Sequence, residues 1–358
     1  MMQEKELQEL QLICQLLNIP IIDKNRKYWL VRTESGKFFE DFLFNNYIAL
    51  GWDKIEDINV YSQMPEKERL EEIAKLYEEE KEKRPGAIYN QIMRFTYEMR
   101  PGDIVLIPSE NSFQIAFGEL IDDVVYPYEK KIDFQEESTY PECTYNRRRN
   151  VNWIKIVKRD LLDPYLYKLM CSHAAISDAC AYSNYIDRTL SPIFVKDDLV
   201  HVVYDVTTTA NIPATSIISF ISSVLSILDV FNTITESSYD KNDIDLRLNV
   251  QSPGPIEFIG YATGGGLVLG AISLALFGAK FNLELLGTVK FNIDTKGLAG
   301  SILEFIKEKN QNNQEILKSK NDLKKHKEIL KAYAPYEERT TPNKKIDENQ
   351  ISIDDITN

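Results

Sequence analysis

The apolar positions of the first half alternate between helical and strand-like spacing, which predicts a mixed α+β domain. Residues 3–17 place leucines and isoleucines on one helical face, so we expect an amphipathic helix within residues 1–20. Apolar and turn residues further on predict helices at 65–84 and 87–99 and strands at 28–34, 47–52, 104–108, 113–121 and 151–157. We therefore expect a PUA-like β-barrel with flanking helices over residues 21–165, closing near residue 160.

The second half is more apolar and again mixes the two spacings. We expect a helical connector at 166–198, an α+β domain at 199–333 and a disordered acidic tail at 334–358, where large apolar residues are few. Within the α+β domain, the pattern predicts strands at 201–209, 243–250 and 256–260, an apolar helix at 216–231, a hairpin at 281–293 and a long helix from 297 to about 332.

The glycine-rich segment 258–279 carries no charge, and three interpretations of it stay open. It is long enough to span a bilayer, although it begins with a predicted strand and lacks a basic cluster at its start. Gly264 to Gly266 could open a phosphate loop, although Leu269 stands where a third glycine is needed. We favour the third interpretation, a buried helix packed on the apolar helix 216–231.

Composition and charge narrow the classes of partner. The net charge of −13 argues against broad, non-specific binding to nucleic acid or anionic membrane, and leaves room for a local basic groove. The charged N-terminus lacks the apolar core of a signal peptide, so we expect a cytoplasmic protein with reduced cysteines. Membrane association through 258–279 is the alternative, and homo-oligomers would form through 258–279 and 297–332.

No catalytic or metal-binding pattern stands out. Cys171, His173 and Cys180 are close in sequence but lack the paired spacing of zinc ligands. His173, His201 and His326 are dispersed, and none lies in a motif with a nucleophile. We therefore predict no catalytic residues, no metal and no cofactor.

The first half carries an ordered set of short motifs. They are Trp29 and Arg32, Gly51-Trp52, Gln91 with Arg94 and Phe95, Gly102-Asp103 with Val105, Gly118-Glu119, Tyr126 with Tyr128, and Arg148 with Val151 and Trp153. In this order they resemble the EVE-like, PUA-superfamily domain of bacterial restriction and defence proteins, including Mrr-type endonucleases. The resemblance covers residues 28–160. The second half resembles an uncharacterised bacterial domain with the same Ser-Pro-Gly bend.

The resemblance implies a pocket that accepts a flipped, often modified, base. It makes Trp29 and Trp52 the stacking wall and Tyr126 the pocket edge. Contacts to the base or its phosphates would come from Arg32, Arg94 and Arg148. Core packing, which is common for large aromatic residues, is the alternative for Trp29, Trp153 and Trp52.

In the restriction enzymes a nuclease follows this domain, but no Asp…Glu-x-Lys arrangement follows residue 160 here. We therefore expect a sensor of modified or flipped bases in DNA or RNA, acting in antiviral defence without a nuclease of that type. The alternative is a membrane-acting or oligomerising effector gated by a nucleotide-like small ligand. A third interpretation makes the barrel a protein-interaction module.

Overall fold

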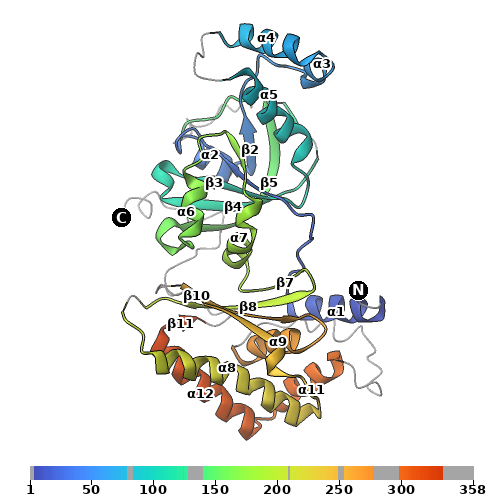
Figure 1. Cartoon of the computed structure of the whole chain (residues 1–358), viewed down its shortest axis with the longest axis vertical. Helices are drawn as coiled ribbons and strands as arrows, with labels where there is room; N and C mark the ends of the chain where they lie inside the picture. Colours follow the sequence, from blue (N-terminus) through green and yellow to red (C-terminus); the bar gives the residue numbers. More distant parts are fainter. Residues whose placement is uncertain are drawn as a thin grey trace, which may run out of the picture. The chain divides into compact units, whose positions relative to one another are not determined.

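The computed structural model describes residues 4–78, 84–123, 125–127, 140–208, 210–248, 254–277 and 298–333. The chain is a mixed α+β protein that divides into two units (Figure 1). The contiguous unit comprises Asn25–Ile186. The discontinuous unit joins Met1–Lys24 to Asp187–Pro342.

A curled, half-barrel sheet forms the centre of the contiguous unit. Its strand order is β2-β5-β4-β3-β1-β6, and only the β1–β3 pair among these is parallel. The strands are β1 (Tyr28–Val31), β2 (Tyr47–Leu50), β3 (Ile104–Pro108), β4 (Gln114–Leu120), β5 (Arg147–Lys158) and β6 (Ile176–Asp178). The described strands form an open sheet with β2 and β6 at its two ends, so they do not show the closed barrel that we expected near residue 160.

Short helices surround this sheet and complete its core. They are α2 (Phe39–Phe44), α3 (Ile58–Ser62), α4 (Glu66–Leu76), α5 (Pro85–Met93), the π-helix η1 (Arg94–Glu98), the 3-10 turns η2 (Glu110–Ser112), η3 (Arg159–Leu161) and η4 (Cys180–Tyr182), α6 (Tyr165–Met170) and α7 (Ser183–Leu190), which ends beyond the unit boundary. Ile73, Ile88 and Ile92 are buried and extend the core toward α4 and α5.

The discontinuous unit has a second sheet in the order β11-β8-β10-β9, with β7 also paired to β8. Its strands are β7 (Ile193–Lys196), β8 (Leu199–Val206), β9 (Ile244–Leu248), β10 (Gly254–Tyr261) and β11 (Ala332–Tyr333). Its helices are α1 (Glu4–Leu17), α8 (Ala214–Thr235), α9 (Gly265–Phe277), α11 (Leu298–Asn310) and α12 (Gln314–Leu330), with the 3-10 turn η5 (Lys241–Asp243) before β9. Figure 1 shows α8, α9, α11 and α12 gathered on one side of this sheet.

The N-terminal helix packs in the core of the discontinuous unit. Leu10, Ile13 and Leu17 of α1 are buried in the same cluster as residues of β8, α8 and α9. After the helix, Ile21 forms a parallel bridge with Val195 of β7, so the chain adds a short stretch to this sheet before it enters the contiguous unit.

The apolar segment 258–279 divides between a strand and a helix. Phe258 to Tyr261 complete β10, and α9 has 13 residues, about 20 Å, against a hydrocarbon core of about 30 Å. Every residue from Gly265 to Leu276 is buried. A Cβ at Gly266 would lie 2.3 Å from the carbonyl oxygen of Gly260, so these two glycines allow α9 to begin against β10.

A different helix is the candidate for membrane contact by length and composition. Among the described residues, α8 alone is long and apolar enough to cross a bilayer, and a third of its most apolar window is buried. A core helix of a soluble protein has the same properties, and Phe220, Val224 and Phe231 of α8 are fully buried.

The single long helix expected from Gly297 to about Ala332 is wrong, because it is interrupted. Helix α11 ends at Asn310 and α12 begins at Gln314. Asn312 has a left-handed φ of 59°, and the side chain of Asn313 accepts a hydrogen bond from the amide of Glu315, which caps α12. The expected hairpin at 281–293 and tail at 334–358 lie outside the described residues.

The connector 166–198 is not wholly helical, because it contributes a strand to each sheet. β6 completes the first sheet and β7 pairs with β8 in the second. At three and four residues, these strands are too short to show the alternation by which longer strands are predicted.

Candidate functional site

Trp29, one of the two expected stacking residues, lies in the core of the contiguous unit. Its side chain is 1% exposed, and the indole Nε1–H donates a hydrogen bond of 2.8 Å to Oδ2 of Asp103. In this structure Trp29 is therefore a core residue, and the indole joins β1 to the turn before β3.

The three consecutive arginines of β5 all donate to backbone carbonyls. Arg149 is fully buried and donates to the carbonyls of Phe95 and Met99, at the end of the π-helix η1. Arg148 lies 4.1 Å above the ring of Tyr47 and donates to the carbonyls of residues 143 and 145. Burial lowers the pKa of Arg147 and Arg149, yet arginine remains charged at neutral pH.

The other two expected arginines have similar partners. Arg32 donates to the carbonyls of Met170 and Ser172, where α6 ends and its last carbonyls need donors. Burial also lowers the pKa of Arg32. Arg94 donates to the carbonyl of Ile176 at 3.4 Å and lies 4.0 Å from the carboxylate of Glu98. These contacts of Arg32 and Arg94 are those of residues that stabilise the fold.

Trp52, by contrast, is half-buried and has an unusual backbone conformation. It follows β2 with a φ of 63°, in the left-handed region that bulky side chains rarely adopt. Arg147 stabilises this turn, because its Nη1 donates to the carbonyls of Gly51 at 3.2 Å and Trp52 at 3.1 Å. Asp53 completes the turn by accepting a hydrogen bond of 3.0 Å from the amide of Asn146.

A second aromatic ring and a carboxylate lie beside the turn. The ring of Tyr145 is so close that a Cβ on Gly51 would lie 3.3 Å from it. The Tyr145 hydroxyl donates to Oε1 of Glu34, which is exposed and has a φ of 50°. We define the Trp52 site as Glu34, Gly51, Trp52, Asp53, Tyr145 and Arg147.

Tyr126 lies across β5 from β2, because Arg148 pairs with both at the start of β5. Arg148 pairs with Ala49 of β2 and forms an isolated bridge with Tyr126. The Tyr126 hydroxyl donates to Oδ1 of Asn150 at 2.9 Å, and burial raises the pKa of Tyr126. Of the expected site residues, Trp52 thus follows β2 and Tyr126 lies on the opposite side of β5, with Arg148 on β5 between them.

Sequence reasoning missed Glu34, Tyr145 and the role of Arg147. Glu34 and Tyr145 lie in polar segments without distinctive spacing, so no sequence signal marks them. The Arg-Arg-Arg run indicated positive charge at residues 147–149. It did not indicate that Arg147 donates hydrogen bonds to the Trp52 turn.

The discontinuous unit contains a buried charged cluster that sequence reasoning also passed over. Nδ1 of His201 lies 2.7 Å from Oε1 of Glu257, and Nη1 of Arg188 lies 3.2 Å from Oε2. The ring of Phe194 stacks on the His201 imidazole at 4.5 Å. Burial raises the pKa of Glu257, but His201, Arg188 and Arg247 together outweigh it, and the pKa falls below its ordinary value. The buried carboxylate of Glu257 is therefore paired on both oxygens, as a buried charge requires.

Among the described residues, no group of three or more His, Cys, Asp or Glu side chains could hold a metal ion. The Trp52 site therefore offers an aromatic face, a tyrosine and two carboxylates as its means of recognition. Such groups suit a flat, polar, aromatic ligand.

Comparison with protein families finds a match over residues 27–174, to a family described as a domain of unknown function (DUF8426). The match begins just before β1 and ends just before β6, so it covers nearly all of the contiguous unit. No curated protein matches the chain.

Proposed function

We propose that the contiguous unit recognises a single flat base, extruded from DNA or RNA, by stacking it on Trp52. The observation that carries the proposal is the left-handed conformation of a half-buried tryptophan. Such a conformation has a cost of about 1–3 kcal/mol and persists where the surroundings impose it, commonly at ligand sites.

The contacts around Trp52 explain how its left-handed backbone is maintained. Arg147 is 8% exposed and donates to two successive carbonyls of the turn, so it holds the backbone rather than a ligand phosphate. The turn that carries Trp52 is thereby fixed, and the Trp52 side chain packs partly against the core of the unit. Stacking on a fixed aromatic ring is worth about 1–3 kcal/mol per base, which helps to offset the energy of extruding the base.

The charges of the site favour contact with the edge of a base over contact with a phosphate. We expected a basic groove around Trp52 from Arg94 and the 147–149 run, but these arginines donate to backbone carbonyls. The carboxylates of Glu34 and Asp53 lie there instead, 3.6 Å from Lys37 and 3.8 Å from Arg147. Carboxylates accept hydrogen bonds from exocyclic amino groups, as they do from cytosine N4. A base with a free amino group, modified or not, is therefore the chemistry that this site fits.

This proposal keeps the base pocket and the Trp52 stacking face that the resemblance to EVE-like, PUA-superfamily domains implies, but not Trp29 in the stacking wall or the contacts from Arg32, Arg94 and Arg148. We assign the contiguous unit a PUA-like role as the sensor of a cytoplasmic defence protein. The same chemistry would also accept a free nucleoside, so the experiment must separate the two sources of the base.

The experiment uses the full chain and tryptophan fluorescence. Trp29 and Trp153 are 1% and 9% exposed, so Trp52 is the tryptophan that a ligand can reach. We would titrate free nucleosides, and matched oligonucleotides that carry the same bases in single strands and mismatched duplexes. Bases with and without modification are compared at each step.

Both Trp52 variants lack the reporting indole, so their binding, like that of the wild type, is measured by fluorescence anisotropy of a dye-labelled oligonucleotide, with free nucleosides as competitors. We expect Trp52→Ala to weaken binding of the preferred oligonucleotide by about 5- to 150-fold, and Trp52→Phe to retain part of the affinity. Phe113→Ala is the matched control, because it removes an exposed aromatic ring elsewhere in the same unit. Equal affinity of wild type and Trp52→Ala would refute the stacking role. Binding of free nucleosides alone would refute the nucleic-acid target.

A further inference from the structure

The second sheet ends in an edge strand with an unusual pattern of side chains. Within the described ranges, β9 pairs with β10 and with no other strand. Its sequence is Ile-Asp-Leu-Arg-Leu, and Leu246 and Leu248 are 38% and 45% exposed. Exposed apolar edge strands invite pairing with another chain unless charges or a covering segment prevent it.

The register of β9 shows which face each residue occupies. Leu246 is paired with Phe258 and Leu248 with Ile256, both of which face the helical core. Asp245 and Arg247 are exposed and lie on the opposite face, since side chains alternate along a strand. The edge therefore has one apolar and one charged face.

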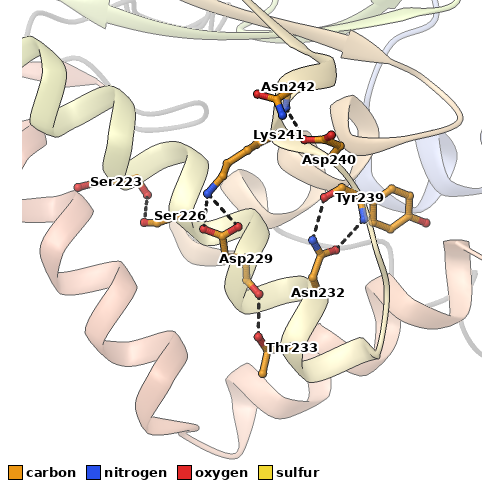
Figure 2. Close-up of polar contacts among 9 residues, drawn as sticks. All are labelled: Ser223, Ser226, Asp229, Asn232, Thr233, Tyr239, Asp240, Lys241 and Asn242. Carbon is orange, nitrogen blue, oxygen red and sulfur yellow. Dashed lines mark hydrogen bonds and ion pairs between the residues drawn. The ribbon is translucent and has the colours of Figure 1, made fainter.

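The start of β9 is fixed to α8, as Figure 2 shows. The side chain of Asn232 both donates to the carbonyl of Tyr239 at 2.8 Å and accepts from its amide at 3.1 Å. Lys241 lies 2.8 Å from the carboxylate of Asp229. These contacts hold the turn that leads into β9, so the edge is presented in a defined position.

We propose that β9 is the interface with a second copy of this chain, paired antiparallel about Leu246. A two-fold axis through Leu246 places Asp245 of each copy opposite Arg247 of the other. It also places Ile244 opposite Leu248 and the two Leu246 side chains beside each other. The result is two cross-strand ion pairs on one face and an unbroken apolar row on the other.

The charge pattern selects this partner and this register. An axis through residue 245 would place two aspartates opposite each other, and an axis through residue 247 two arginines, and both arrangements are unfavourable. Only the axis at Leu246 makes every pair complementary. A closed dimer also requires the same surface on both copies, which antiparallel pairing of one strand provides.

The burial of α9 favours β9 over α9 as the place of self-association. The sequence led us to expect self-association through 258–279, but Gly265 to Leu276 are buried in the core of their own unit. β9, at the edge of the same sheet, instead leaves both its leucines exposed.

The test is a charge swap measured by sedimentation equilibrium of the full chain at low salt. We expect the wild type to approach twice 41.3 kDa as its concentration rises. Asp245→Arg and Arg247→Asp should each raise the dimer Kd by about tenfold or more, because each places like charges opposite one another. The double variant D245R/R247D restores two opposite pairs and should dimerise again.

Mixing the two single variants gives the sharpest result. One then carries arginine at both positions and the other aspartate at both, so a mixed dimer contains two complementary pairs. Association on mixing, with neither variant dimerising alone, supports both the strand and the register. Glu68→Arg is the control, since it makes the same charge change at an exposed position of α4.

Three outcomes would overturn the proposal. These are a wild type that stays monomeric, single variants that dimerise like the wild type, and folded single variants that fail to associate on mixing. Circular dichroism of each variant establishes that it is folded, so a misfolded variant is not counted as a loss of association. Leu246→Lys provides an independent check, because it places two lysines together at the axis.

Discussion

Replacing Asp103 with alanine tests a carboxylate of the contiguous unit that accepts three hydrogen bonds. Asp103 is 4% exposed and follows the Pro-Gly turn that begins β3. Its Oδ1 accepts from the amide of Lys27 at 3.0 Å, and its Oδ2 from the indole of Trp29 at 2.8 Å and the amide of Arg100 at 2.9 Å. The alanine variant loses all three acceptors at once.

The magnitude follows from the burial of the donors. A buried donor that loses its acceptor costs about 1–3 kcal/mol. The amides of Lys27 and Arg100 are part-buried and belong at the lower end of this range, and the indole of Trp29 is buried and belongs near its middle. Together they predict a loss of about 4 kcal/mol in the free energy of unfolding of this unit.

Urea unfolding followed by tryptophan fluorescence measures this loss in the right unit. All three tryptophans lie in the contiguous unit, at positions 29, 52 and 153. With a slope of about 2 kcal/mol per molar urea, the midpoint should fall by about 2 M. Asp103→Asn keeps the shape and one oxygen, and should lie between wild type and the alanine variant.

The reasoning would be refuted if Asp103→Ala shifted the fluorescence midpoint by less than about 0.5 M, since that is below the cost of one unpaired donor. Tyrosine and backbone signals from the discontinuous unit do not interfere, because excitation at the red edge selects tryptophan.

Two further predictions concern one residue in each unit. Gly118→Ala should destabilise the contiguous unit by about 1–3 kcal/mol in the same titration, because a Cβ there would lie 2.6 Å from the ring of Trp153 at the β4–β5 bulge. An unchanged urea midpoint would contradict this prediction, because it would mean that the bulge accommodates the Cβ without loss of stability. Glu257→Gln should destabilise the discontinuous unit by about 3 kcal/mol at neutral pH, since it leaves His201 without its carboxylate. The lowered pKa of Glu257 stabilises the fold above its ordinary value of 4.5 and ceases to do so as pH falls through the folded value. Circular dichroism at several pH values should therefore show a weaker acid dependence in the glutamine variant, and identical dependence would contradict the assignment.

The longer elements were predictable because their patterns extend over several residues. The strands near 104–108, 113–121 and 151–157 and the apolar helix near 216–231 were located from sequence spacing, and the structure confirms them. The break between α11 and α12 could have been recognised from the Asn312-Asn313 pair, because asparagine favours both left-handed and N-cap positions.

The candidate site was less predictable, for a physical reason. The sequence shows that arginines are present at 147–149, but their partners are backbone carbonyls, which every residue has and which leave no trace in the sequence. Likewise, nothing in Gly-Trp-Asp indicates that Trp52 has a positive φ, because this conformation is imposed by a partner about 95 residues away.

The split of the discontinuous unit has a consequence for how this protein is made. Residues 25–186 emerge from the ribosome as an uninterrupted stretch and can complete their sheet while the second half is still being synthesised. Helix α1 emerges earlier still, yet its partners β8, α8 and α9 come last. The apolar face of α1 therefore stays exposed to solvent while the first sheet is synthesised. We expect a chaperone to bind this face during translation.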